Sequence, residues 1–411
     1  MTPLQLTALF LTLVAAAGWI NARWLRLPSA VAMVLAGAAI PALQPVLSRF
    51  GADPVSLARQ VDFPQTVLGT MLAFLLFAGA AQVDLPELRR RWASVLSLAT
   101  LGVLASTALV GGGLWFAASR LGLDLPLPWA LAFGALISPT DPVAVLAAVK
   151  GEGLSAAVRT LLQGEALFNY GVGIVVFAVT SDFLAGGPTP NLWVVAGFTV
   201  ISAAGGLLVG LAGGWLVLRL MRAVDDYAVE VTLTLALAAG AYVLAQALHL
   251  SGPIAAAAAG LLIGDSRMGS VMSKITRRYV TNFWTLVDEV LNALLFLLLG
   301  LQLLVVPFRA KDIGLWLIAI LLALVARFLV AAPWGLFFTL RLGERGATRL
   351  MTWGGLHGAL SLALALTLPE GPRRGLVLSI TYAVVVFSIV AQGLTFPALA
   401  RRLQGAKAQA V

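Results

Sequence analysis

The chain has 411 residues, of which 60% are hydrophobic and only 11% are charged, far from the composition of a soluble protein. Its 27 Lys and Arg against 18 Asp and Glu give a net charge of +9, which in a soluble chain would suggest a nucleic-acid partner, but basic loops also orient membrane helices. The absence of cysteine excludes disulfides, thioether-linked haem and thiolate metal sites. The composition therefore indicates a membrane protein with many spans.

Apolar runs of roughly 20 residues, the length that crosses a hydrocarbon core of about 30 Å, recur along the chain. The first run lacks the basic start of a signal peptide and is long enough to span, so we interpret it as the first transmembrane helix. The sequence predicts an all-α polytopic membrane protein with about thirteen transmembrane helices, of which the ninth is short and rich in alanine. The spans are predicted to begin near residues 3, 28, 65, 94, 127, 157, 192, 229, 252, 283, 313, 348 and 375.

Most Lys and Arg residues lie in the loops that follow odd-numbered spans or at the adjoining span ends. By the positive-inside rule these loops are cytoplasmic, so the N-terminus is predicted to lie outside and the C-terminus inside, in a bacterial inner (plasma) membrane. This distribution explains the net charge without nucleic acid, and we expect no nucleic-acid partner. Residues 1–403 are predicted to form a single transmembrane transporter domain, and residues 404–411 a short cytoplasmic tail.

The fifth span, WALAFGALISPTDPVAVLAAVK, is predicted to be broken near residues 139–142. Pro139 and Pro142 bracket Thr140 and Asp141, and each proline removes a backbone donor and clashes with the preceding turn. Non-helical backbone at membrane depth is tolerated only where protein or a water-lined cavity covers it. The break therefore predicts a binding site beside Asp141.

The twelfth span, RLMTWGGLHGALSLALALTLP, is predicted to be broken near residues 354–358. Gly354, Gly355 and Gly358 surround His357 and weaken the helix near its middle. Interrupted segments in corresponding positions of two halves point to the binding site of a transporter. The alternative is that these glycines only permit close packing of helices.

Four ionisable residues lie deep inside predicted spans, where charge is costly unless it is paired or functional: Asp141, Glu165, Arg327 and His357. Arg327 cannot lose its proton and needs an anion, for which Glu165 and Asp141 are the candidates at similar depth. A structural Glu165–Arg327 pair is the simpler interpretation. Asp141 would then be the carboxylate that can exchange its proton for a small cation, with freed carbonyls and hydroxyls as further ligands.

Other polar positions in the spans receive less specific predictions. Glu165 and Asn169, four residues apart, share a helix face, and Tyr170 lies about 100° further round. Asp288, Glu289 and Asn292 lie in the cytoplasmic half of the tenth span, where Asp288 and Asn292 share a face, and are predicted to form a solvated helix end or entry funnel, not a site. Two histidines, no cysteine and no cluster with metal-ligand spacing leave no hydrolytic or redox site, so we expect neither an enzyme nor a cofactor. The expected partners are a small cation, the proton and the lipid bilayer.

Five segments of the chain carry a specific pattern: LLFAGAAQVDLPELRRR, LISPTDPVAVL, GEALFNYGVGIVVF, HLSGPIAAAAAGLLIGD and WGGLHGALSLALALTLP. Together they resemble the signature segments of monovalent cation/proton antiporters, the NhaP-type sodium/proton exchangers. The resemblance covers roughly residues 20–400. It implies two inverted-topology repeats of six helices, a mobile core domain beside a dimerisation domain, a homodimer, and a structural Glu165–Arg327 pair.

The chain departs from the family pattern at two positions of its predicted ion site. The family ordinarily has an Asn-Asp pair where this chain has Asn169-Tyr170, and Gly-Leu-Arg-Gly where this chain has His357 after Leu356. One interior charge of each sign is lost, so the net interior charge is that of the family pattern. The predicted ion-binding set becomes Asp141, Thr140, Asn169, Tyr170 and His357, with the cation at Asp141.

Three functions are compatible with this set. The first is exchange of sodium, or of lithium or potassium, for protons. The second is transport of another solute, which an aromatic ring with a polar tip such as Tyr170 would suit. The third is a transport-inactive regulatory homologue or variant, because fold does not fix function.

Overall fold

The computed structural model of the chain describes residues 2–42, 44, 49, 61–141, 154–184, 186, 192–265, 272–309, 312–344 and 346–408. Within these ranges every regular element is a helix, and no residue is in a strand. The predicted all-α class is confirmed. The larger helices are α1 (Pro3–Ile20), α2 (Ser29–Ala42), α5 (Leu72–Ala81), α6 (Leu85–Ser97), α7 (Val103–Arg120), α8 (Leu127–Ile137), α10 (Ala156–Leu184), α11 (Leu192–Met221), α12 (Tyr227–Ala247), α13 (Gly252–Gly264), α14 (Lys274–Leu301), α15 (Ile313–Leu342), α16 (Ala347–Trp353), α17 (Ala359–Ala365), α18 (Pro372–Phe387) and α19 (Gly393–Ala408).

Several helices contain or adjoin short segments with wider or tighter turns. The π-helical segments are η1 (Asn21–Leu25), η3 (Gln65–Met71), η4 (Leu98–Gly102) and η8 (Ser388–Gln392), and η6 (Gln302–Leu304) is a 3₁₀ turn. Such π-helical turns are frequent at functional sites. The segment η8 joins α18 to α19 and lies beside the site described below.

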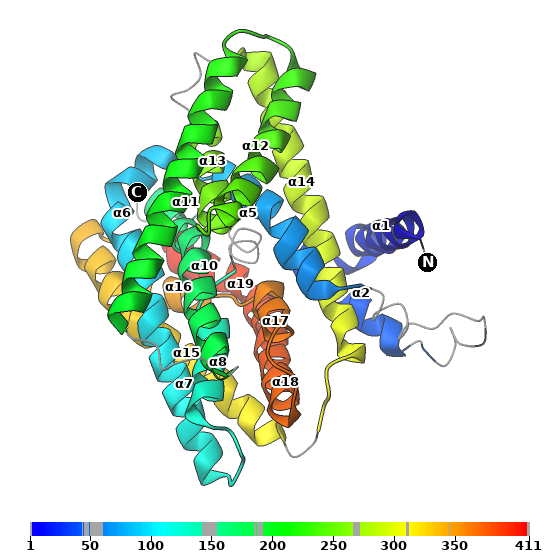
Figure 1. Ribbon diagram of the computed structural model, residues 1–411, viewed down its shortest axis with the longest axis vertical. Coiled ribbons are helices and arrows are strands. Elements are labelled where there is room, and N and C mark those ends of the chain that lie inside the picture. Colours follow the sequence, from blue (N-terminus) through cyan, green and yellow to red (C-terminus); the bar gives the residue numbers. More distant parts are fainter. Residues whose placement is uncertain are drawn as a thin grey trace.

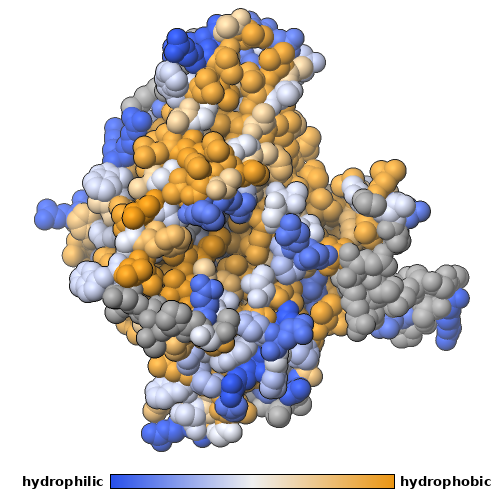
Figure 2. All heavy atoms as spheres, in the orientation of Figure 1, coloured by the Kyte–Doolittle hydropathy of each residue, from blue (hydrophilic) through white to orange (hydrophobic). Residues whose placement is uncertain are grey.

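Eight helical stretches in the described residues are long and apolar enough to cross a membrane, judged by length and composition. Four shorter apolar helices accompany them: Ser29–Ile40, Gln65–Ala81, Leu127–Ile137 and Gly252–Gly264. Figure 2 shows hydrophobic residues over much of the upper half of one face, with hydrophilic residues gathered at its top. The polytopic membrane class is therefore confirmed, whereas the exact number of spans and the inverted repeats stay predictions.

The helices begin where polar side chains can satisfy the first backbone N–H groups. Asp226 caps α12, its carboxylate accepting from the backbone N–H of Ala228 at 2.8 Å. Ser251 caps α13, its hydroxyl accepting from the N–H of Ile254 at 3.3 Å. Between such caps the apolar runs satisfy their own backbone groups, which is what a bilayer requires.

Two groups of buried hydrophobic residues organise the packing. One lies among α5, α11, α12, α13 and α14, which meet in the upper half of Figure 1, while α11 and α14 continue into its lower half. The other and larger group includes residues of α7, α8, α10, α15, α16, α17 and α18, which form its lower part. Small residues allow close contact inside the first group, because Gly260 of α13 lies against the Phe77 carbonyl of α5, where a Cβ would have no room.

Helical structure stops at both predicted breaks. Helix α8 ends at Ile137, and residues 138–141 are not helical. Residues 142–153, which include Pro142 and the rest of that predicted span, lie outside the described residues. Helix α16 ends at Trp353, residues 354–358 are not helical, and α17 begins at Ala359. At the C-terminus, α19 continues to Ala408, beyond the domain limit predicted at residue 403.

Candidate functional site

The two breaks meet in the interior of the molecule. The backbone N–H of Asp141 donates to the backbone carbonyl of Leu356 at 2.7 Å, so the non-helical stretch after α8 is tied to the one between α16 and α17. Asp141, Thr140 and His357 are all at least nine-tenths buried. The breaks thus satisfy part of each other's freed backbone while placing a carboxylate, a hydroxyl and an imidazole together.

Gly358 allows the closest approach at this crossing. A Cβ added to Gly358 would collide with the Asp141 carboxylate. The backbone of Gly358 is extended, with φ −128° and ψ −164°, a conformation open to other residues. The requirement for glycine here is therefore space for the Asp141 carboxylate, not a special backbone angle.

Substitution Gly358→Ala is expected to lower the free energy of unfolding by about 1–3 kcal/mol, the usual effect of forcing a methyl group into filled space. Gly112→Ala is the matched control, because a Cβ at Gly112 of α7 meets no atom within 4 Å. Alanine is favoured over glycine inside a helix by roughly 1 kcal/mol, so this control should be neutral or slightly stabilised. Thermal unfolding in detergent measures both, and equal melting temperatures would contradict the close approach.

Asn169 of α10 reaches the first break. Its Nδ2 donates to the Thr140 hydroxyl at 2.8 Å, and both residues are buried. The other end of the amide is different, since Asn169 Oδ1 has no hydrogen-bond partner among the described residues although it is shielded from solvent. A buried oxygen without a partner is destabilising, so this atom is suited to accept from a bound ligand or to coordinate a cation.

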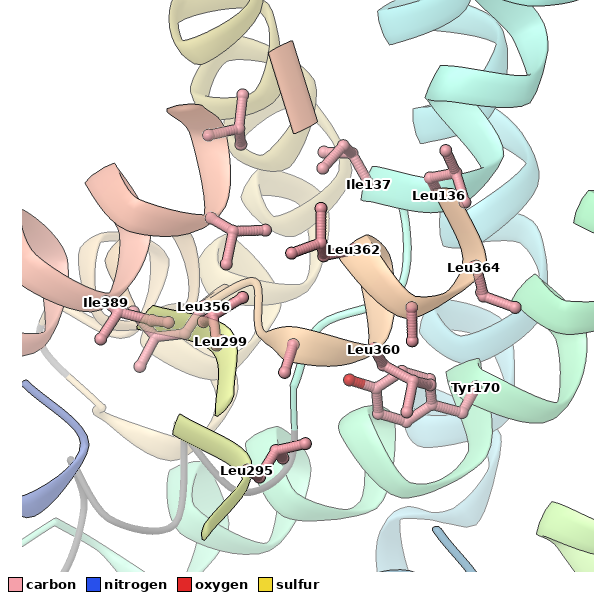
Figure 3. Packing of buried hydrophobic residues seen from close by; sticks show 14 of the residues in the cluster. Leu136, Ile137, Tyr170, Leu295, Leu299, Leu356, Leu360, Leu362, Leu364 and Ile389 are labelled. Carbon is pink, nitrogen blue, oxygen red and sulfur yellow. The ribbon is translucent and has the colours of Figure 1, made fainter. Parts of the chain in front are cut away.

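Tyr170 packs differently from its neighbour. It is 4% exposed and belongs to the larger hydrophobic cluster, together with Leu356 and Leu360 (Figure 3). The structure therefore places Tyr170 next to Asn169 on α10, with its ring in apolar surroundings.

His357 is held by contacts at its backbone and its ring. Its backbone N–H donates to the Ser388 hydroxyl at 2.8 Å, and its Nδ1 lies 3.4 Å from the Pro139 carbonyl, a group freed by the break. Ser388 in turn donates to Oε1 of Gln392 at 2.7 Å, and Gln392 Nε2 donates to the Trp353 carbonyl at 3.2 Å. These contacts fix the second break from both of its ends.

Ser388 and Gln392 were not among the residues predicted for the site. Both are buried and lie in η8, where they stand four residues apart in an otherwise apolar stretch. Two polar side chains on one face of an apolar span are the signal that could have identified them.

The deep arginine and the glutamate of α10 form an ion pair. Arg327 of α15 donates from both terminal nitrogens to the two carboxylate oxygens of Glu165, with Nη2 to Oε2 at 2.9 Å. Its Nε donates to the Met351 carbonyl of α16 at 3.0 Å, and a Cβ added to Gly355 would collide with that guanidinium. The two-fold contact connects α10, α15 and the helix that leads into the second break.

The prediction for Asp288 was wrong. Asp288 is 3% exposed, accepts from Asn292 Nδ2 at 3.0 Å and accepts from Gln82 Nε2 at 3.3 Å. The carboxylate is thus part of a buried polar contact between α14 and the end of α5, not a solvated helix end. The shared face of Asp288 and Asn292 was recognised, but the sequence did not show that this face turns toward Gln82.

The chain is similar along nearly its whole length to known proteins. A family model described as "Sodium/hydrogen exchanger, transmembrane" matches residues 9–402. The Na(+)/H(+) antiporter NhaP of Pseudomonas aeruginosa is 40% identical over 410 residues, 97% of each chain. The Na(+)/H(+) antiporter NhaH of Halobacillus aidingensis is 35% identical, over 97% of this chain and 96% of that protein.

A solved structure agrees with this relationship at the level of the fold. The sodium proton antiporter MjNhaP1 from Methanocaldococcus jannaschii, at pH 8, superimposes with a TM-score of 0.72 over 98% of this chain and all of that one, at 21% identity. The similarity of fold and the matches over nearly the full length lead to one assignment. The chain belongs to the sodium/hydrogen exchanger family.

Proposed function

We propose that this protein is a secondary antiporter that exchanges a monovalent cation, sodium or alternatively lithium or potassium, for protons across a membrane. The observation that carries the proposal is the buried Asp141 carboxylate at the crossing of two broken helices. The names of the two relatives above, both Na(+)/H(+) antiporters, support the same chemistry. A buried carboxylate between two broken helices is the kind of site found in transporters.

The exchange follows from competition at one carboxylate. The Asp141 carboxylate binds either a proton or a cation. Binding of one excludes binding of the other. Alkali cations prefer oxygen ligands, and Asn169 Oδ1, the Thr140 hydroxyl and the Pro139 carbonyl supply such atoms around the break. A bound cation would also be a partner for Asn169 Oδ1, which accepts no hydrogen bond among the described residues.

The unusual residues fit this scheme as a compensated pair. In place of the acid and the arginine of the family pattern, Tyr170 supplies a neutral wall and His357 a side chain that is neutral or charged depending on pH. The ring of Tyr170 lies among buried hydrophobic residues, a position that gives no support to an organic substrate. The Glu165–Arg327 pair is assigned a structural role that orients α10 and α16 around the site.

The proposed location is a bacterial inner membrane, with a defined orientation of the two termini. The excess of basic residues in loops after odd-numbered spans supports an N-terminus outside and a cytoplasmic C-terminus, in a bacterial inner membrane. The family assignment supports a homodimer with no enzymatic activity of its own.

Reconstitution tests the function directly. The purified protein in vesicles that contain a pH-sensitive dye should move protons when sodium, lithium or potassium is added outside. The relative rates with the three ions identify the preferred cation. Vesicles without protein are the control. No response to any of the three ions would reject cation/proton exchange and favour another solute or a transport-inactive homologue.

Substitution His357→Gln is expected to keep cation binding to a lower pH than in the wild type. Protonation of His357 would add a positive charge that competes with a cation, whereas glutamine keeps hydrogen bonding without titrating. The charged or titratable groups near it are Asp141, whose carboxylate lies against Gly358, and the Glu165–Arg327 pair, whose guanidinium lies against Gly355. The pH dependence of sodium-driven proton movement measures the shift.

His249→Gln is the matched control for this experiment, because His249 is the other histidine of the chain and lies exposed beyond the end of α12. Its pH profile should equal that of the wild type. An unchanged profile in His357→Gln as well would make His357 a packing residue and assign the pH response to Asp141.

A further inference from the structure

A groove on the outside of the bundle has the character of an amphiphile site. It has a volume of about 580 Å³ and lies among α15, α16 and α19, away from Asp141. Two arginines, Arg349 and Arg402, line it together with apolar and hydroxyl-bearing side chains. The residues that line the groove include Phe328, Arg349, Trp353, Thr395, Leu399 and Arg402.

Charge and apolar surface are separated along this groove. On α19, Thr395, Leu399 and Arg402 follow one helix face over about 10 Å of rise, with the arginine at the C-terminal end. On α16, Arg349 precedes Trp353 by one turn. Phe328 lies near the middle of α15. Both walls therefore carry their arginine at the end predicted to be cytoplasmic and their apolar surface further into the bilayer.

The two guanidinium groups are suited to an anion. Arg349 and Arg402 are both exposed, and neither forms an ion pair with a carboxylate among the described residues. Deeper in the groove, the indole N–H of Trp353 donates to the Thr395 hydroxyl at 2.8 Å, so its ring is fixed as part of the wall. Tryptophan is typical of the level where headgroups meet acyl chains.

We propose that this groove binds an anionic phospholipid, with its phosphate between Arg349 and Arg402 and an acyl chain along Phe328 and Leu399. Charge complementarity selects an anionic headgroup: arginine pairs with phosphate through two parallel hydrogen bonds, and a zwitterionic headgroup brings a positive charge of its own next to the two arginines. The apolar wall selects a lipid over free phosphate, which would leave Phe328 and Leu399 uncovered. Binding at this site does not depend on what the protein transports.

Hydrogen bonds also connect the groove to the second break. Trp353 is the last residue of α16, its carbonyl accepts from Gln392, and Gln392 is linked through Ser388 to the backbone of His357. A lipid that holds α16 against α19 would therefore stabilise one end of residues 354–358. Any effect on exchange rests on the proposed function, so the test below measures binding.

Native mass spectrometry of the full chain in detergent tests the proposal. Phosphatidylglycerol is expected to bind at least about tenfold more tightly than phosphatidylcholine with the same acyl chains, and the variant Arg349→Gln/Arg402→Gln should lose that preference. Arg278→Gln, an exposed arginine of α14 outside the groove, should keep it. Each single groove variant should show an intermediate loss, and melting temperatures establish that every variant is folded.

Four outcomes would overturn the proposal. Equal binding of the two lipids by the wild type would remove headgroup recognition without any use of variants. Undiminished preference in the double variant would place the lipid elsewhere. Competition by glycerol 3-phosphate as strong as that by the lipid would make the groove a site for soluble anions, and a changed ratio of monomer to dimer in the double variant would make it a contact between two copies of the chain.

Discussion

Asp141→Asn is expected to abolish cation-driven proton movement while the protein stays folded. Asparagine has nearly the same shape and keeps the backbone N–H that donates to Leu356, but it can neither hold a negative charge nor release a proton. If one carboxylate carries both ions, no exchange remains above the background of empty vesicles. Dye fluorescence in reconstituted vesicles and thermal unfolding in detergent measure the two parts of the expectation.

Asp124→Asn controls for the loss of a carboxylate as such. Asp124 lies at the surface, where it accepts from Arg373 Nη2 at 2.8 Å, and it is not one of the residues at the crossing of the breaks. Its exchange rate should equal that of the wild type. Full exchange by Asp141→Asn would mean that another group carries the proton, and a large drop in its melting temperature would mean that the residue is structural.

The sequence predicted the positions of the breaks because their causes are local. Pro139 removes a backbone donor, and Gly354, Gly355 and Gly358 lower the helical propensity of a short stretch, whatever the rest of the chain does. The breaks that the structure shows at residues 138–141 and 354–358 lie at these residues. The same holds for the all-α class, which follows from apolar runs of bilayer length.

What the sequence could not predict are the partners chosen across the fold. Nothing local shows that Gly358 lies against the Asp141 carboxylate, or that Ser388 accepts from the backbone of His357. The buried contact of Asp288 could not be predicted either, because its partner Gln82 lies 206 positions away in the sequence. Only the deep ion pair could be foreseen at long range, since an arginine in a membrane interior has few possible partners.

That pair gives the second large effect: replacing either Glu165 or Arg327 alone should destabilise the protein more than replacing both. A single change, Glu165→Leu or Arg327→Leu, leaves one buried charge without its partner, which typically lowers the free energy of unfolding by about 3–5 kcal/mol. The double change leaves no charge and should recover most of this loss. It should not recover all of it, since Arg327 also donates to the Met351 carbonyl.

Thermal unfolding in detergent of the wild type, the two single variants and the double variant gives the coupling between the two residues. The Asp124–Arg373 pair supplies the matched control, because its side chains are 76% and 40% exposed and a solvated pair contributes only about 0–1 kcal/mol. The cycle on Glu165 and Arg327 should show a coupling several times larger than the cycle on that surface pair. Additive losses at Glu165 and Arg327 would refute the pairing, and α16 would then depend on the contact between Arg327 and Met351 for its position beside the second break.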